Sequence, residues 1–350
     1  MTAIKVLLTG ANGFIGSHIL DALLRHGLQV TAVVRSELKA TQVRRDFPAT
    51  EDQLNFVIVP DISAPGAYTK ILKADPSVQY IIHTASPLNY SLGKTVEDFV
   101  NPAVRGTREI LEAAAQYGCN VQRVVVTGSF AAIGNPEDMQ GGGKVYTSQD
   151  WNPVTAEKLD ARNPRLAYWF SKTLAERAAW AFMDECKRSF DLVVLNPPMV
   201  YGPLRHTVES LEELNVTTYN IWRDFLNASP DHPLPHEWVH ADIDVRDLAE
   251  THYNALFSQA ASNKRYLVTR GRICNQEIAD ILRETIPELR DRVPVGEPGV
   301  SSLPRDAFDV DGGAAMEDLQ LTVRPAADTF RDLGKQLLLL EAKCLSEHWA

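Results

Sequence analysis

Short apolar runs alternate with amphipathic segments through the first half of the chain. The apolar runs predict strands at residues 5–9, 29–34, 55–59, 80–83, 123–127 and 192–195. The segments between them carry apolar residues at helical spacing and predict helices at 13–26, 36–46, 68–73, 96–117 and 166–187. In the run Leu192-Val193-Val194-Leu195 no polar residue alternates with the apolar ones, as is typical of a strand buried on both faces. The alternation predicts an α/β fold, a doubly wound parallel sheet of Rossmann type.

After Asn196-Pro197-Pro198 the pattern becomes irregular. Residues 204–240 are rich in proline, histidine, glutamate and aromatic residues, which predicts loops around one helix near residues 218–227. Beyond them we predict a helix at 245–257, a strand at 265–269, a helix near 275–285, a surface segment at 293–313 and a last helix at 325–340. We therefore expect a Rossmann domain over residues 1–196 and a smaller substrate-binding lobe over 197–350, some segments of which return to the first domain.

Composition narrows the class of protein. Hydrophobic residues make up 45% and charged residues 23%, which are ordinary values for a globular protein. The net charge of −10 argues against a nucleic-acid or anionic-membrane partner. Neither a signal peptide nor a run of ~18 apolar residues is found, so we expect a cytoplasmic protein without a membrane segment. Four widely separated cysteines predict reduced thiols rather than disulfides or a zinc site, and the oligomeric state, monomer or homodimer, stays open.

A glycine loop connects the first predicted strand to the first predicted helix, with the sequence Thr9-Gly10-Ala11-Asn12-Gly13-Phe14-Ile15-Gly16. Gly10 would make the tight turn off the strand, Gly13 would let the backbone approach a pyrophosphate, and Gly16 would let the helix pack closely on the sheet. The amino terminus of that helix would supply amide donors to the anion. The loop predicts a dinucleotide site contacted by Gly10, Asn12, Gly13, Phe14, Ile15 and Gly16.

The second predicted strand ends at Arg35, with Lys39 one helical turn further on. An acidic residue at this place, about 20 residues past the glycine loop, would hold the ribose 2′-hydroxyl of NAD. A guanidinium there suits a 2′-phosphate instead, so NADPH is favoured over NADH. The alternative is a solvated basic pair at the start of a helix. Glu37 is an acidic residue close to this place and would favour NADH, but it lies inside the helix rather than at the strand end.

Other strand ends offer further cofactor contacts. Asp61 and Ile62 follow the third strand, where a carboxylate could accept from the adenine amino group, although a turn aspartate fits equally well. Ala85 and Ser86 follow the fourth strand and are small enough to leave room for a cofactor ribose. Thr127 closes the fifth strand and completes the predicted cofactor set on this edge of the sheet.

Tyr168 and Lys172 lie four residues apart at the head of a predicted helix, so the phenol and the ammonium share one helical face. A cation beside a phenol lowers the tyrosine pKa towards neutrality, which suits a general acid that protonates a carbonyl oxygen. Ser129, at the end of the fifth strand, can donate its hydroxyl to the same carbonyl. Tyr-x-x-x-Lys occurs often by chance, and a strand-end serine is often only a backbone cap. Behind a glycine loop, the three together predict a redox enzyme.

Three histidines recur every four residues at His232, His236 and His240, with Glu237 and Asp242 nearby, a spacing that resembles a metal-binding helix face. The prolines at 233 and 235 exclude a regular helix through them. We therefore predict a loop with scattered histidines and no metal site.

The combined motifs resemble the extended short-chain dehydrogenase/reductase family. They comprise the glycine loop, Ser129, Tyr168-x-x-x-Lys172, the run from Asn196 to Pro203, and residues 239–249 with Asp244-Val245-Arg246-Asp247. Arg35 and the Tyr168 context are most similar to the dihydroflavonol 4-reductase-like branch, and residues 172–180 resemble fungal NADPH-dependent methylglyoxal and aldehyde/ketone reductases. The chain departs from the family at Gly128, where a second serine or similar residue is usual, and residues 204–240 align with nothing in the family.

The resemblance implies about seven parallel strands and a reaction in which NADPH delivers hydride from nicotinamide C4 to a carbonyl carbon while Tyr168 gives the proton. Lys172 would also hold the nicotinamide ribose, and Pro197 and Val200 would line the nicotinamide pocket. Walls for an apolar small-molecule carbonyl substrate would come from aromatic residues that could equally be core packing, namely Phe130, Tyr201, Trp222 and Phe225.

Three other functions fit the same scaffold. A nucleotide-sugar epimerase retains its NAD, so Arg35 counts against it. A hydroxysteroid-type dehydrogenase often carries a membrane segment, which this sequence lacks. A non-catalytic NADP-sensing regulator has no use for the intact set of Ser129, Tyr168 and Lys172.

Overall fold

The computed structural model describes residues 3–48, 52–86, 97–158, 163–186, 188–236 and 239–347. Its centre is a sheet of seven parallel strands in the order β10-β7-β5-β4-β1-β2-β3. Their bounds are β1 Lys5–Thr9, β2 Gln29–Val34, β3 Leu54–Ile58, β4 Tyr80–His83, β5 Arg123–Thr127, β7 Asp191–Asn196 and β10 Lys264–Leu267. The strand order reverses between β1 and β4, which is the topological switch point of a doubly wound sheet. The prediction of a Rossmann-type parallel sheet is confirmed.

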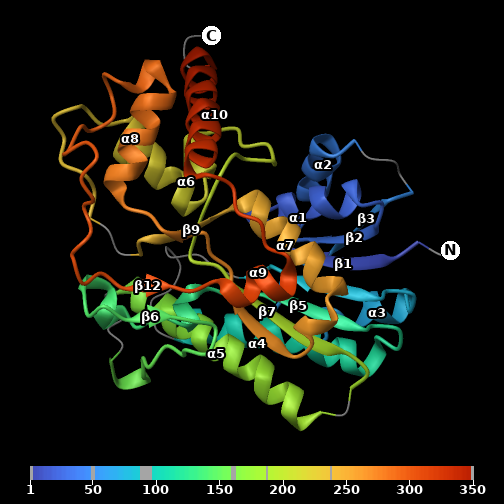
Figure 1. Cartoon of the computed structure of the whole chain (residues 1–350). Coiled ribbons are helices and arrows are strands. Elements are labelled where there is room, and N and C mark those ends of the chain that lie inside the picture. Colours follow the sequence, from blue (N-terminus) through green and yellow to red (C-terminus); the bar gives the residue numbers. More distant parts are fainter. Residues whose placement is uncertain are drawn as a thin grey trace.

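Helices cover both faces of this sheet because successive residues of each strand point to opposite sides. In β1, Leu8 packs into one apolar core with α1 (Phe14–Arg25), α2 (Glu37–Asp46) and α7 (Val245–Phe257). Leu7 packs into the other core with α3 (Thr69–Ala74), α4 (Glu97–Tyr117) and α5 (Pro164–Glu185). Both leucines are fully buried, and the two helical layers lie above and below the sheet in Figure 1.

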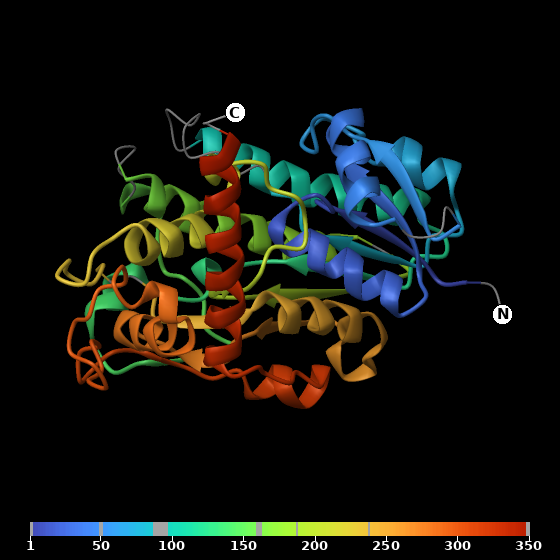
Figure 2. The ribbon, with the colours of Figure 1, turned by 90° about the horizontal axis from the view of Figure 1, so that it is seen from above.

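A small lobe, built on a three-stranded sheet, stands beside the carboxyl ends of the central strands (Figure 1). Its strands are β8 Met199–Tyr201, β9 Ala241–Asp244 and β11 Gly271–Arg272, and its helices are α6 Val216–Ile221, α8 Asn275–Thr285 and α10 Ala326–Glu347. A third core joins these helices, and Figure 2 shows α10 between α8 on one side and α1 and α2 on the other. The last helix begins within a residue of its predicted start and runs seven residues past its predicted end at 340.

Several later segments return to the central sheet. Strand β10 is its edge strand, α7 packs on α1, and α9 (Gly313–Leu319) packs on β10. A two-stranded sheet of β6 (Val145–Tyr146) and β12 (Asp309–Val310) also joins the two halves of the chain. We propose the division between the Rossmann domain and the small lobe at residue 197, with α7, α9 and β10 counted with the first. None of the helices in the described residues is long and apolar enough to cross a membrane.

Candidate active site

A large cavity of about 1270 Å³ opens at the carboxyl ends of the central strands, between the sheet and the small lobe. Its floor comes from the residues that directly follow β1, β2, β3, β4, β5 and β7, and its other walls come from α5, α6 and residues 197–201. This is the place where doubly wound folds bind their ligands. The cavity is long enough to run from the glycine loop to Asn275 and Ile278 of α8.

The glycine loop forms a cradle that has no room for side chains. Gly10 has a φ of +75°, and a Cβ on it would lie 2.9 Å from the amide nitrogen of Ala85. A Cβ on Gly16 would overlap the carbonyl oxygen of Gly10, so α1 can approach the sheet this closely only with glycine there. Gly13 caps α1 without a side chain, which leaves the first-turn amides for an anion. All the loop residues that we predicted to contact a dinucleotide, from Gly10 to Gly16, line the cavity.

The structure places Arg35 at the exposed rim of the cavity, directly after β2. Lys39 lies one turn into α2 and is not among the lining residues; its amide donates to the capping hydroxyl of Ser36 at 3.3 Å. Asp61 lines the cavity but also accepts from the amide and hydroxyl of Ser63, at 2.8 and 2.6 Å. These bonds lower the Asp61 pKa and give it the geometry of a turn aspartate. Its neighbour Ile62 lines the cavity as well.

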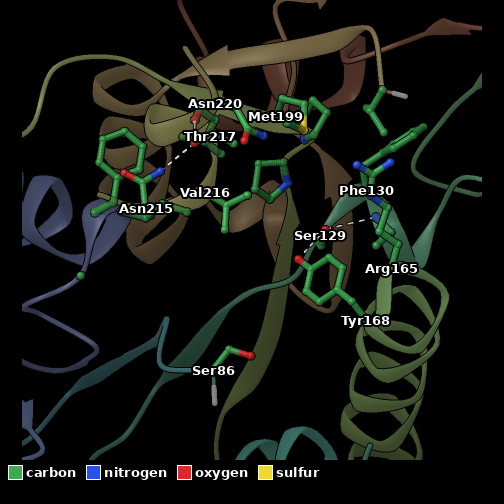
Figure 3. A pocket seen from close by; sticks show the side chains of 18 of the residues that line it. Ser86, Ser129, Phe130, Arg165, Tyr168, Met199, Asn215, Val216, Thr217 and Asn220 are labelled. Atoms are coloured by element: carbon green, nitrogen blue, oxygen red, sulfur yellow. Dashed lines mark hydrogen bonds between the residues drawn. The ribbon is translucent and has the colours of Figure 1, made fainter. Parts of the chain in front are cut away.

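Two hydroxyl groups meet at one end of the cavity. Tyr168, near the start of α5, donates its phenol to Oγ of Ser129 at 3.3 Å (Figure 3). Ser129 follows β5 and caps the 3₁₀ turn Phe130–Ala132, accepting from the amide of Ala131 at 3.2 Å. A carbonyl oxygen placed between the two hydroxyl groups could accept from both. The structure therefore brings together Ser129 and Tyr168, which the sequence predicted to act on the same carbonyl.

Lys172 lies behind this pair rather than on the main cavity wall. Its ammonium donates to the carbonyl oxygen of Thr127 at 3.4 Å, and both residues line a small adjoining cavity of about 20 Å³. Ala85 and Ser86 line both cavities, so they connect the lysine to the cofactor-sized space. Burial lowers the pKa of Lys172 to about 8, with the carboxylate of Glu176 acting in the opposite direction.

The pKa of Tyr168 is shifted upwards, opposite to the predicted direction. Burial raises the pKa of Tyr168, and the hydrogen bond with Ser129 lowers it by less. The ammonium of Lys172 donates to the Thr127 carbonyl, so burial and not a hydrogen bond from the lysine sets the direction of this shift. Tyr168 consequently remains a neutral phenol at pH 7, which is the protonation state that a proton donor must have.

Three of the four aromatic residues predicted as substrate walls line the cavity, and the fourth does not. Phe130, Tyr201 and Phe225 line the cavity, yet each is at least nine-tenths buried and packs mainly against other core residues. Trp222 does not line the cavity, so its prediction as a substrate wall is not supported. Its indole nitrogen instead donates to Glu341 of α10 at 3.2 Å, and the π-helical turn Trp222–Leu226 begins at this residue. Pro197 and Val200 line the cavity as predicted.

Sequence reasoning missed the wall formed by α6. Val216 and Asn220, one helical turn apart, both point into the cavity (Figure 3), and the Val216 side chain is 55% exposed although it is apolar. Met199 completes this wall from β8. These residues lie in or next to the segment 204–240, whose irregular pattern gave no signal of which side chains face a ligand.

The histidines of that segment have different surroundings in the structure. His232 is exposed and contacts the carbonyl of its neighbour Pro233, whereas His240 is buried with its ring 3.8 Å from that of Phe308. His236 lines the cavity, and Glu237 lies outside the described residues. Across the residues that the structure describes, no group of three or more His, Cys, Asp or Glu side chains is arranged to hold a metal ion.

Gly128, the departure from the family pattern, has a steric reason. A Cβ on Gly128 would overlap Oδ1 of Asn196, the last residue of β7. That same oxygen accepts from the backbone amide of Ser129 at 2.8 Å. The fully buried Asn196 amide therefore occupies the space that a second serine side chain would need.

We predict that Gly128→Ala displaces the Asn196 amide and lowers the free energy of unfolding by about 1–3 kcal/mol, a typical cost of overpacking. Urea unfolding measures this change. In a double-mutant cycle, Asn196→Ala should cost less in the Gly128→Ala background than in the wild type, because it removes the group that the new methyl meets. Strictly additive costs would contradict this steric explanation.

Comparisons with known proteins agree with this geometry. The model of the NAD dependent epimerase/dehydratase family matches residues 6–264. The chain is 36% identical to the ketoreductase azaE of Aspergillus niger over 91% of this chain and 93% of that protein. It is 32% identical to the NADPH-dependent methylglyoxal reductase GRE2 of Saccharomyces cerevisiae over 97% and 99%. The crystal structure of yeast methylglyoxal/isovaleraldehyde reductase Gre2 complexed with NADPH superposes with a TM-score of 0.91 at 30% identity, covering 97% of this chain and all of that one.

Proposed function

The chain belongs to the NAD dependent epimerase/dehydratase family, and we propose that it is an NADPH-dependent reductase that converts an aldehyde or a ketone to the alcohol. The observation that carries this proposal is the pair of hydroxyl groups of Ser129 and Tyr168, 3.3 Å apart at one end of the cavity. The other end of the same cavity is the glycine cradle with Arg35 at its rim.

The residues present fit NADPH. The tight turn at Gly10 and the close approach of α1 at Gly16 require that a Cβ is absent at both positions, and they bring the amino end of α1 to the cavity for a pyrophosphate. Arg35 offers a guanidinium where a 2′-phosphate would lie. Pro197 and Val200 would line the nicotinamide side, and Lys172 would hold the ribose hydroxyls. When bound there, NADPH supplies a hydride to the carbonyl carbon of the substrate.

The protein supplies the proton and the electrostatic stabilisation. As negative charge builds on the carbonyl oxygen, Ser129 donates a hydrogen bond to it and Tyr168 transfers its phenolic proton. The carbonyl carbon has then gained a hydride and the oxygen a proton, which gives the alcohol and NADP⁺. The ammonium of Lys172, one turn along α5, stabilises the phenolate left behind until solvent returns the proton.

We propose that the substrate is a small carbonyl compound with an apolar body. Relatives are named for methylglyoxal, isovaleraldehyde and ketone reduction. Around the hydroxyl pair, Met199 and Val216 provide apolar walls, while Asn220 offers an amide on the same face of α6 (Figure 3). The two apolar side chains suit an apolar chain or ring beside the carbonyl, and Arg165 and Asn220 offer polar contacts to the rest of the substrate.

A cofactor and substrate panel tests the proposal. We expect NADPH to be oxidised in the presence of several aldehydes, diketones or aryl ketones, with much slower oxidation of NADH, as followed by NADPH absorbance. An enzyme that binds NADPH tightly but reduces none of these carbonyls would favour a sensing role instead. Equal use of NADH, with cofactor retained through purification, would favour an epimerase.

A further inference from the structure

A buried carboxylate lies one helical turn beyond Lys172 on α5. Glu176 is 3% exposed and accepts two hydrogen bonds from Arg265 of β10, at 2.6 and 3.0 Å. It also accepts from the indole of Trp180 at 3.2 Å and from the side-chain amide of Asn196 at 3.4 Å. With Lys172 it lines the small cavity behind the hydroxyl pair. The mechanism described above has no use for this group.

The Asn196 amide connects Glu176 to the active site. Its nitrogen donates to Glu176, and its oxygen accepts from the backbone amide of Ser129 at 2.8 Å. The two bonds fix which way the amide is turned, because a carboxylate accepts only from the nitrogen and an N–H donates only to the oxygen. The space that Asn196 fills exists because residue 128 is glycine.

Glu176 is also the acidic group that acts on Lys172. Burial disfavours the ammonium, and the carboxylate four residues away opposes it. Among the other titratable groups in the described surroundings, His83 of β4 stays neutral because burial lowers its pKa to about 3. Tyr168 on the same helix is a neutral phenol at pH 7, and the cationic Arg265 is bound to Glu176 itself.

We propose that Glu176 is a positioning residue for the reduction: it holds the Asn196 amide that fixes the Ser129 backbone, and it keeps Lys172 charged. The turnover part of this inference rests on the proposed function. A merely structural ion pair would explain the contacts of Arg265, which also donates to the carbonyls of Ser148 and Asp150. If Glu176 had only that structural role, its hydrogen bond with Asn196 and its charge near Lys172 would not affect turnover or NADPH binding.

The experiment compares Glu176→Gln with a matched control, Asp191→Asn. Asp191 begins the strand that Asn196 ends, and it forms a similar two-bond pair with Arg123 at 2.6 and 2.8 Å, at the amino ends of β7 and β5. Both variants replace a carboxylate by an amide of the same shape beside a mostly buried arginine. Loss of an ion pair is therefore common to both, and only Glu176→Gln should affect the active site.

Two quantities are measured as a function of pH. One is kcat, and the other is the affinity for NADPH, which cofactor fluorescence reports and from which the pH of half-maximal binding is taken. For the wild type we expect both to decline near pH 8, where Lys172 loses its proton. Glu176→Gln should move this decline to lower pH by roughly one unit, because an opposing charge is removed, and should therefore lower kcat at pH 8 by about fivefold. Asp191→Asn should keep the wild-type pH profile.

Asn196→Ala tests the link from Glu176 to the Ser129 backbone separately from the effect on Lys172. It also replaces Glu176→Gln as the test of that link if Glu176→Gln does not fold. It should lower kcat about tenfold with the pH profile unchanged, because the carboxylate remains. A Glu176→Gln enzyme with the wild-type pH profile, or an Asn196→Ala enzyme with full turnover, overturns the corresponding part. If the wild type reduces no carbonyl, the proposed function fails, while the pH dependence of NADPH binding still decides the role of Glu176.

Discussion

Replacing Tyr168 by phenylalanine is expected to lower turnover of the best carbonyl substrate by about 10²–10⁴, the range that general acid catalysis typically contributes. The ring and its packing stay in place, and only the hydroxyl that donates to Ser129 is lost. Affinity for NADPH should change little, because the glycine cradle, Arg35 and Lys172 are untouched. Steady-state kinetics and fluorescence titration measure the two quantities separately.

Lys172→Ala is the informative companion to this variant. It removes the ammonium that donates to Thr127 and should weaken both turnover and NADPH binding, because the same group would stabilise the phenolate and hold the ribose. The two variants thus separate proton transfer from cofactor binding. A Tyr168→Phe enzyme with near-normal turnover would exclude Tyr168 as the proton donor.

The parts of the fold that sequence alone predicted are those with a local cause. Strands such as β5 and β7 were predictable because burial on both faces requires continuous apolar runs, as in Leu192–Leu195. The glycine cradle was predictable because a positive φ at Gly10 and a close approach at Gly16 exclude other residues. The tyrosine and lysine on α5 were found from their four-residue spacing together with the glycine loop that precedes them.

The parts that sequence reasoning missed depend on contacts between distant residues. Helical spacing placed Lys172 on the face of Tyr168, but a long flexible side chain has several possible partners, and here it reaches Thr127. The direction of the Tyr168 pKa shift depends on burial, which no local pattern reports. The fit between Gly128 and Asn196 joins residues 68 positions apart and is visible only once β5 and β7 lie side by side.

The small lobe was the least predictable region for a related reason. The aromatic residues Trp222 and Phe225 have similar chemistry and lie three residues apart, yet only Phe225 reaches the cavity. A π-helical turn changes the angle between successive side chains, and nothing in the sequence pattern indicated it. The position of Val216 and Asn220 on the cavity wall is therefore visible only in the structure.

Arg35→Asp is expected to move cofactor preference from NADPH towards NADH. The substitution removes a cation from the rim of the cavity where the 2′-phosphate would lie and adds a repelling charge. A hydrogen bond to a charged group is worth about 1.5–3 kcal/mol, so the Michaelis constant for NADPH should rise roughly 10- to 100-fold. The constant for NADH, which has no such phosphate, should change little, and kcat should be nearly unaffected because the contact is remote from the hydroxyl pair.

The matched control is Arg45→Asp, which makes the same change of charge near the end of α2, the helix that follows Arg35. Arg45 is 58% exposed, pairs with Glu209 at 3.0 Å and does not line the cavity. If general electrostatic attraction of the cofactor were the cause, both variants would weaken NADPH binding alike, and both effects would fade at high salt. A specific phosphate contact predicts a large effect for Arg35 and almost none for Arg45. A wild-type enzyme that already uses NADH as well as NADPH would show that Arg35 is only a solvated side chain at the start of α2.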